Sequence, residues 1–211
     1  MYKFVLTSNK SHTMARIKTE KNLSRKDVIV SKAATLFREK GYKAASMRDL
    51  AEAVGVEAAS LYNHIKSKSE LLHELVFSVA NKFVLKLDEI ESESIPSLKK
   101  MEKILRFHIS EMIHHYEEVY VSDREWKHLS DPYLSNYQNQ RRVYRKRLAA
   151  IIEEGIRNKE IKAIDAPTVV LIFLHAVSGI ESWHRSTKKI SAEELEQNMV
   201  AILIDGLKAN S

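Results

Sequence analysis

The chain has 211 residues, of which 44% are hydrophobic and 29% charged, a balance typical of a globular protein with a buried core. Its 5 glycines and 3 prolines are too few for a β architecture with many turns and favour long helices joined by short loops. The absence of cysteine excludes disulfides, thiolate catalysis and cysteine-ligated zinc. Neither a long apolar stretch nor a leader-like N-terminus is evident, so we expect a cytoplasmic protein with no membrane partner.

Positive charge is concentrated in the first third of the chain. Residues 1–70 hold 14 Lys and Arg against 7 Asp and Glu, whereas the remaining residues hold 20 against 21. Such a surplus attracts DNA, because bound Lys and Arg release the counterions condensed on the phosphates. Residues 1–24 show no periodicity and are expected to form a flexible basic arm, whose Arg16, Lys18 and Lys21 add phosphate or minor-groove contacts.

Apolar residues recur at helical spacing from Arg25 onward. The first predicted helix carries an apolar stripe and ends before a glycine (Val28, Ile29, Ala33, Leu36, Phe37, then Gly41). Ser46 is expected to cap a short second helix, with Asp49 completing a capping box. A third helix is predicted over about 57–64 and a fourth from near Ser67 to beyond Leu87.

Longer helices are predicted beyond Pro96, over about 97–119, 132–157, 166–185 and 192–207, with a short helical piece near 122–128. No alternating strand pattern is present. We therefore expect an all-α fold, with an N-terminal three-helix DNA-binding domain over residues 25–70 and a C-terminal helical domain over residues 71–211.

The stretch around Gly55 predicts a helix-turn-helix. Glycine enters the left-handed backbone region without penalty, as a tight turn between helices requires, and Leu50, Ala51, Val56 and Leu61 supply the small core that sets the angle. The second helix of such a motif lies in the major groove of DNA.

This part of the chain resembles the TetR family of bacterial regulators over about 45 residues, in order and spacing. The matching segments are Leu36-Phe37 to Gly41-Tyr42, Ser46 to Ala51, Gly55-Val56, Leu61 to Ile65 and Lys68 to Leu71. There are two departures from the family pattern: Ile65 replaces a usual Phe, and Glu57-Ala58 replaces a common Ser and basic residue. The base preference of the family is therefore not carried over.

The resemblance implies a homodimer that binds double-stranded operator DNA as a repressor and is released by a small-molecule effector. Arg48 would reach phosphate or the groove edge, while five residues would face the bases (Glu57, Ala58, Ala59, Ser60, Asn63). Tyr62, His64 and Lys68 resemble the phosphate clamps of the family.

The last two predicted helices are suited to the dimerisation that the resemblance implies for the C-terminal domain. The segment 166–180 is apolar almost all round and must be buried on every side, and the last helix adds further apolar residues (Leu195, Met199, Ile202, Leu203, Leu207). Pairing with symmetry mates would form a four-helix interface in which Ala176 and Gly179 allow close approach. The alternative is burial within the core of a monomer.

Polar residues on apolar stripes mark the predicted ligand-binding site. Arg141 lies amid such a stripe, and a buried guanidinium either meets an internal acid or binds an anionic ligand. The candidate residues are His108, Trp126, Tyr137, Arg141, Tyr144, His175 and Trp183. For each residue taken singly, the alternative is a satisfied polar group of the core.

The segment 132–194 more loosely resembles the TetR subgroup that senses acyl-CoA thioesters. This resemblance rests on Tyr133-Leu134, Arg141 to Tyr144, Glu154-Gly155-Ile156, Trp183, Ile190-Ser191 and Glu193-Glu194. A basic cluster (Arg141, Arg142, Arg145, Lys146, Arg147) beside an apolar tunnel would hold phosphates. The alternatives are an efflux repressor that senses planar aromatic or drug-like compounds and a ligand-independent activator. The sequence shows no phosphate loop, nucleophile elbow or metal-ligand set, so no enzyme activity, cofactor or metal is expected.

Overall fold

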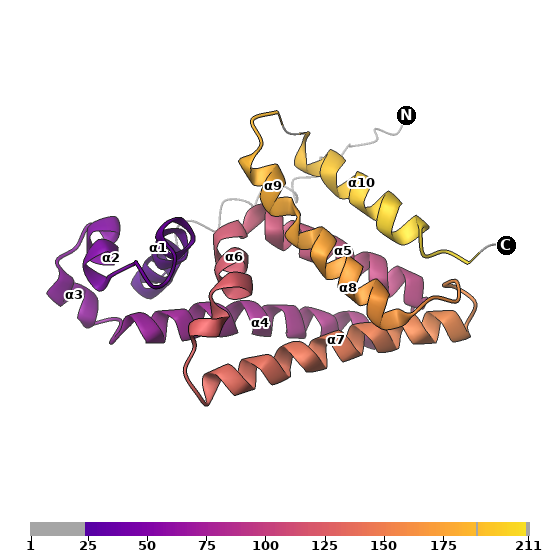
Figure 1. Cartoon of the computed structure of the whole chain (residues 1–211), viewed down its shortest axis with the longest axis horizontal. Helices are drawn as coiled ribbons and strands as arrows, with labels where there is room; N and C mark the ends of the chain where they lie inside the picture. The colour runs from indigo at the N-terminus through magenta and orange to yellow at the C-terminus, as the bar shows by residue number, and fades with distance from the viewer. Residues whose placement is uncertain (1–23, 189, 210–211) are drawn as a thin grey trace, which may run out of the picture.

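The computed structural model describes residues 24–188 and 190–209, and within these ranges the protein is built almost wholly of helices (Figure 1). They are α1 (Arg25–Lys40), α2 (Met47–Val54), α3 (Ala58–Tyr62), α4 (Lys68–Ser92), α5 (Ser97–His114), α6 (Tyr116–Arg124), the 3-10 turn η1 (Trp126–His128), α7 (Tyr133–Arg157), α8 (Ala166–Ser178), α9 (Ile180–Arg185) and α10 (Ala192–Asp205). The expected basic arm, with Arg16, Lys18 and Lys21, lies outside the described residues.

Helices α1 to α3 form a small head, in which α2 is capped as expected. Ser46 and Asp49 form a reciprocal capping box at the start of α2, in which each side chain accepts the backbone N–H of the other residue. Hydrogen bonds from Ser46 and Lys40 hold the pKa of the Asp49 carboxyl far below its usual range. Gly55 ends α2 in the left-handed conformation, with φ at 75°.

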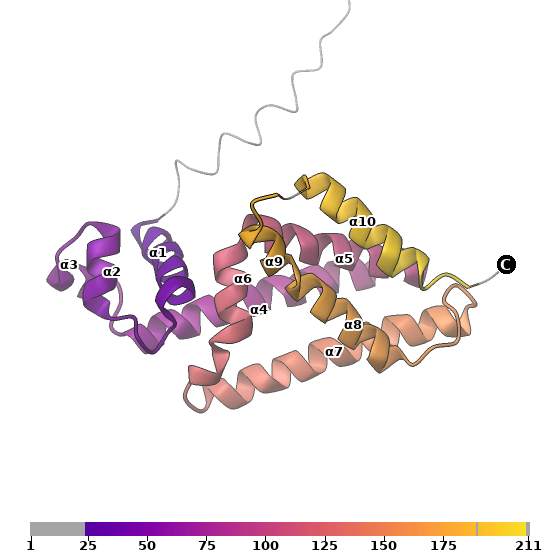
Figure 2. The same cartoon turned by 45° about the horizontal axis from the view of Figure 1, so that its top comes forward.

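Helix α4 runs from the head into the rest of the molecule and shares its apolar residues between two cores. Leu71, Leu72, Leu75 and Val76 pack with α1 to α3, together with residues of α6 and α7. Further along the helix, Leu87 and Ile90 pack into the larger core formed with α5, α7, α8 and α10. Figures 1 and 2 show α4 as a rod that joins the head to this helical body.

Two helices that were predicted as continuous are broken in the structure. The helix expected over 97–119 ends at His114, and α6 starts at Tyr116 after the non-helical His115 (φ −127°, ψ 40°). No glycine or proline marks this break. It lets α6 turn across the molecule to pack against both α1 and α4, so tertiary packing overrides the local preference. The helix expected over 166–185 is divided at Gly179 into α8 and α9.

The segment Ala166–Arg185 is the one described helical stretch that is long and apolar enough to cross a membrane by length and composition, and 33% of its apolar window is buried. Val169, Phe173 and Val177 pack into the core of the body. The opposite side is open, with Ile172 53% exposed. Core helices of water-soluble proteins meet the same two criteria, so this stretch is weak evidence for a membrane span. The single chain therefore does not cover this helix on every side, and its burial by a partner subunit stays a prediction.

Candidate DNA-binding surface and ligand cavity

The head presents most of the predicted DNA-reading residues at its surface. Arg48 is exposed in the first turn of α2, and Tyr62 at the end of α3 is 51% exposed. Leu61 and Ile65 of the same segment are fully buried and anchor it to the head. Around these anchors Glu57, Ala58, Ala59, Asn63 and His64 are exposed and Ser60 is half-buried. Glu57 is the N-cap of α3 and not a residue of the helix, which is shorter than the predicted 57–64.

Lys68 has a structural position that the sequence did not indicate. Its ammonium donates hydrogen bonds to the backbone carbonyls of Tyr42 (2.8 Å), Lys43 (3.2 Å) and Ala45 (2.8 Å), and it lies 4.5 Å from the centroid of the Tyr42 ring. These contacts use all three of its hydrogens. The side chain therefore ties the start of α4 to the loop between α1 and α2, and a phosphate contact would require it to leave these carbonyls.

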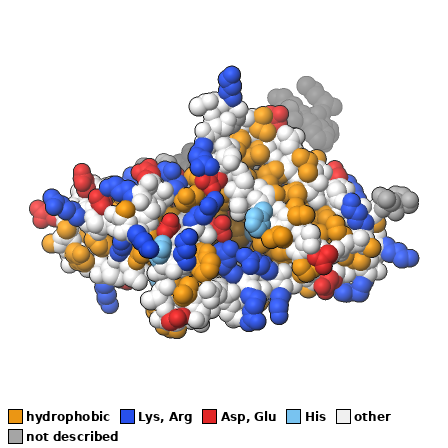
Figure 3. Space-filling model, in the orientation of Figure 1, with side chains coloured by type: hydrophobic (Ala, Val, Ile, Leu, Met, Phe, Trp, Pro, Cys, Tyr) orange, Lys and Arg blue, Asp and Glu red, His pale blue; other side chains and the backbone are white. Residues whose placement is uncertain are grey.

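A cavity of about 790 Å³ lies in the helical body, between α4, α5, α6, α7 and α8. This volume is within the range of small-molecule sites. Its inner wall is mainly apolar, with aliphatic and aromatic residues from all five helices (Val79, Phe83, Val84, Met112, Val119, Tyr120, Ala149, Val170, Leu174, Val177). The space-filling view shows the surface hollowed beside α6, with Lys and Arg side chains gathered below the hollow, over α7 (Figure 3).

Five of the seven predicted ligand-binding residues line this cavity: His108, Tyr137, Arg141, Tyr144 and His175. His108 is buried, and its Nε2 lies 2.7 Å from the Tyr144 hydroxyl. His175 is exposed at the edge of the cavity, with Nδ1 2.8 Å from the Leu171 carbonyl oxygen. The hydroxyl of Tyr137 donates to the Ser122 carbonyl (3.0 Å), so it is already engaged within the wall.

Trp126 and Trp183 are not part of the cavity wall. Trp126 lies in η1, where its ring packs against the ring of Tyr137. The guanidinium carbon of Arg141 lies over the Trp126 ring, 5.3 Å from the ring centroid. Trp183 lies in α9, and its indole N–H donates to the Ile190 carbonyl (2.9 Å). Trp126 thus supports the cavity from behind, while Trp183 faces a separate apolar cleft.

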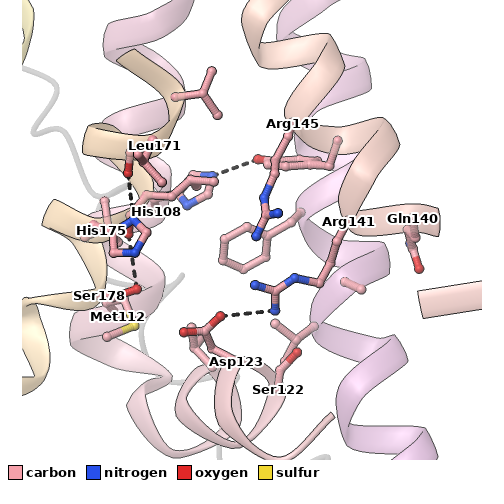
Figure 4. A pocket seen from close by; sticks show the side chains of 18 of the residues that line it. His108, Met112, Ser122, Asp123, Gln140, Arg141, Arg145, Leu171, His175 and Ser178 are labelled. Atoms are coloured by element: carbon pink, nitrogen blue, oxygen red, sulfur yellow. Dashed lines mark hydrogen bonds and ion pairs between the residues drawn. The ribbon is translucent and has the colours of Figure 1, made fainter. Parts of the chain in front are cut away.

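Arg141 is half-buried and meets an acid. Its guanidinium bonds to Asp123 of α6 at 3.1 Å, and both residues line the cavity (Figure 4). The sequence did not indicate Asp123 as a cavity residue, because nothing local connects it with Arg141, 18 positions later. Phe83 is a second missed residue. The apolar stripe of α4 includes it, but a stripe does not show which members face a cavity rather than a packed core.

The predicted basic cluster is divided by the structure. Arg141, Arg145 and Lys146 line the cavity, and Figure 4 shows Arg141 and Arg145 extending into it from α7. Arg147 instead pairs with Asp88 and Glu91 of α4, each at 2.5 Å, and Arg142 bonds to Asn139. Successive residues of a helix point about 100° apart, so the five residues cannot share one face.

Part of the apolar surface of α8 and α10 is uncovered in the single chain. Ile172 and Ile202 are 53% and 72% exposed, and a shallow apolar cleft of about 290 Å³ lies between α8, α9 and α10 (lined by Ala176, Gly179, Ile180, Trp183, Leu195, Met199, Ile202, Leu203). Figure 2 shows α8 and α10 on the same outer side of the body, and Figure 3 shows hydrophobic side chains gathered there.

The chain matches two family models that together cover most of its length. Residues 29–75 match the bacterial regulatory proteins of the tetR family, and residues 94–207 match the tetracyclin repressor-like C-terminal domain. The transcriptional repressor KstR2 of Mycolicibacterium smegmatis is 26% identical over 186 residues, covering 87% of this chain and 91% of the relative.

Solved structures show the same fold. The ketosteroid transcriptional regulator KstR2 of Mycobacterium tuberculosis superposes with a TM-score of 0.82 at 23% identity, covering 90% of this chain and 97% of that one. AibR in complex with isovaleryl coenzyme A and operator DNA superposes with a TM-score of 0.75 at 22% identity, covering 86% and 98%. The helix-turn-helix head, the helical body and both family matches agree, and the chain belongs to the TetR family of bacterial transcriptional regulators.

Proposed function

We propose that the protein is a homodimeric, cytoplasmic repressor that leaves its operator when an acyl-CoA thioester binds in the cavity of the helical body. We choose this effector because the cavity has an apolar interior and a cationic opening. A packed C-terminal core would have favoured a ligand-independent regulator. The similar fold of AibR, which was solved with isovaleryl coenzyme A and operator DNA, supports the proposal.

The opening has cations that the protein itself does not neutralise. Within the described part of the chain, Arg145 and Lys146 make no ion pair, and both are exposed at the cavity. Phosphate groups form strong charge-assisted hydrogen bonds with such side chains. The apolar interior removes an acyl group from water. An acyl-CoA combines these two features in one molecule.

The cavity and the DNA-binding head share two helices. Val79 and Phe83 of α4 line the cavity, and the same helix starts in the head at Lys68. On α6, Val119 and Asp123 line the cavity, while Glu117 lies 3.7 Å from Arg38 of α1. A ligand that repositions α4 or α6 would therefore change the spacing of the two heads. Because DNA and ligand select different spacings, each weakens binding of the other.

The uncovered side of α8 and α10 is the proposed dimer interface. Monomeric proteins rarely leave large contiguous apolar patches in water, and Ile202 with the apolar cleft that it lines forms such a patch. A two-fold interface places the same surface of both subunits together, which presents two heads to two half-sites of a palindromic operator.

The test is release of fluorescently labelled operator DNA, measured by anisotropy at fixed salt during titration with acyl-CoAs of increasing length, free CoA and the free acids. We expect acyl-CoA to release the DNA at concentrations where free CoA and free acid do not. Arg145→Ala should weaken the response about 10-fold, since it removes one charge-assisted contact. Arg142→Ala, on the same helix but outside the cavity, is the matched control and should respond as the wild type.

Release by planar aromatic compounds, with no response to any acyl-CoA, would overturn the effector class. Equal responses of the Arg145 and Arg142 variants would overturn the assigned position of the phosphates.

A further inference from the structure

The proposed function leaves one polar pair of the cavity unused. His108 of α5 and Tyr144 of α7 both line the cavity and lie 2.7 Å apart, from Nε2 to the hydroxyl. His108 is only 5% exposed and is surrounded by aromatic rings, with ring centroids at 4.7 Å for Phe83 and 5.6 Å for Phe173. Polar groups in such surroundings are costly unless they are hydrogen-bonded.

Both members of the pair are neutral at physiological pH. Burial lowers the pKa of the His108 imidazole to about 3 and raises the pKa of the Tyr144 phenol above its usual value. A neutral imidazole has one N–H and a phenol has one O–H. The bond between the two groups uses one of these hydrogens.

One hydrogen therefore remains, whichever tautomer is present. If Tyr144 donates to Nε2, the remaining hydrogen is on Nδ1 of His108. If Nε2 donates to Tyr144, the remaining hydrogen is on the phenol oxygen. Among the described residues, the contact between these two groups is the one hydrogen bond that either of them makes. The apolar interior thus contains one donor without an acceptor.

We infer that the effector carries a carbonyl oxygen on or at the end of its apolar group, and that the His108–Tyr144 pair donates a hydrogen bond to it. This inference rests on the proposed function only in taking the cavity as the effector site. A hydrocarbon of the same shape would leave the donor buried and unsatisfied, and sites built around such a donor discriminate against ligands that lack the matching group. His108 and Tyr144 are then the residues that determine this specificity.

The direct test uses 2-decalone, a saturated bicyclic ketone without charge or CoA, bound to the wild-type protein. The carbonyl stretch is isolated by the infrared difference between ¹³C=O and ¹²C=O ligand. We expect a shift to lower frequency relative to the ketone in hexane, because hydrogen bonding weakens the C=O bond. A band at the hexane position, or failure of 2-decalone to bind, would overturn the inference.

A second test compares affinities for 2-decalone and decalin, which differ in the oxygen. In the double variant His108→Leu/Tyr144→Phe, the preference for the ketone should fall about 3- to 10-fold relative to the wild type, as expected for one neutral hydrogen bond. Tyr120→Phe, which removes the hydroxyl of another cavity tyrosine, is the matched control and should keep the preference. Retention of the wild-type preference by the double variant would overturn the inference.

The carbonyl can be that of a thioester or a second one on the acyl group, and decanoyl-CoA and S-decyl-CoA distinguish these sources. If the wild type prefers decanoyl-CoA to S-decyl-CoA and the double variant loses this preference, the thioester carbonyl is the acceptor. If the double variant loses only the preference for 2-decalone over decalin, the acceptor is a second carbonyl on the acyl group. Because 2-decalone has no CoA and no DNA is present, these measurements remain valid even if acyl-CoA fails to release the operator.

Discussion

Replacing Ile202 with glutamate tests the proposed dimer interface. Ile202 lies on α10, is 72% exposed in the single chain, and lines the apolar cleft together with Ala176 of α8. In the proposed dimer this side chain would be covered by the partner subunit. The substitution Ile202→Glu would place a carboxylate in that apolar surface without disturbing the core of the chain itself.

The exposed fraction of Ile202 determines how strongly the substitution should weaken the dimer. Full burial of an isoleucine side chain is favourable by about 1.5 to 3 kcal/mol. Burial of the 72% of Ile202 that is exposed would therefore contribute about 1 to 2 kcal/mol to the free energy of dimerisation. Two-fold symmetry repeats the substitution, which doubles the loss to about 2 to 4 kcal/mol. A tenfold change in Kd corresponds to about 1.4 kcal/mol, so the dimer Kd should rise about 30- to 1,000-fold. Desolvation of two carboxylates adds to this loss.

Sedimentation velocity over a series of protein concentrations measures this change, and binding to a two-half-site operator should weaken in parallel. Leu85→Glu is the matched control, because Leu85 is 68% exposed but lies on α4, away from α8 and α10. Wild-type dimerisation of the Ile202→Glu variant, or equal dissociation of the dimer by Leu85→Glu, would rule out this interface.

Three further predictions concern the head and the buried histidine. Arg48→Ala should weaken operator binding and reduce the slope of log K against log salt by about 1, since one phosphate contact is lost; an unchanged slope in a salt series would exclude that contact. Lys68→Met should lower the free energy of unfolding by about 3 kcal/mol in urea denaturation, because three backbone carbonyls lose a charged donor; a reduced salt slope at unchanged stability would instead indicate a phosphate contact. For His108, burial lowers the folded-state pKa from 6.5 to about 3, so below pH 6.5 the unfolded state gains a proton that the folded state does not. Between pH 7 and 5 the free energy of unfolding of the wild type should fall by about 2 kcal/mol, a loss that His108→Phe should not show. Identical pH dependence of unfolding in the two proteins would contradict a neutral, buried His108.

The head was the part most accessible to prediction from sequence. The capping box of Ser46 and Asp49 and the left-handed turn at Gly55 both follow from residues within a few positions of one another. Lys68 is the exception. Its partners are the carbonyls of residues 42, 43 and 45 in the loop between α1 and α2, and no local pattern shows that the chain folds back to bring them together.

The cavity was predictable only as a set of candidate residues. The polar positions on apolar stripes suggested His108, Arg141 and Tyr144, and these three residues line the cavity. The same reasoning placed Trp126 and Trp183 with them, although one packs behind the wall and the other faces a different cleft. Periodicity shows that a side chain points inward, but not whether it meets a cavity or a packed neighbour.

The all-α fold class, the helix-turn-helix and the family could be predicted from the sequence, because they depend on apolar periodicity, caps and a turn glycine that act over short distances. No local pattern predicted the break at His115, the pairing of Arg141 with Asp123 or the division of the basic cluster. These features depend on how helices cross. A crossing brings together residues far apart in the chain, and its geometry follows from the packing of whole helix surfaces rather than from any single motif.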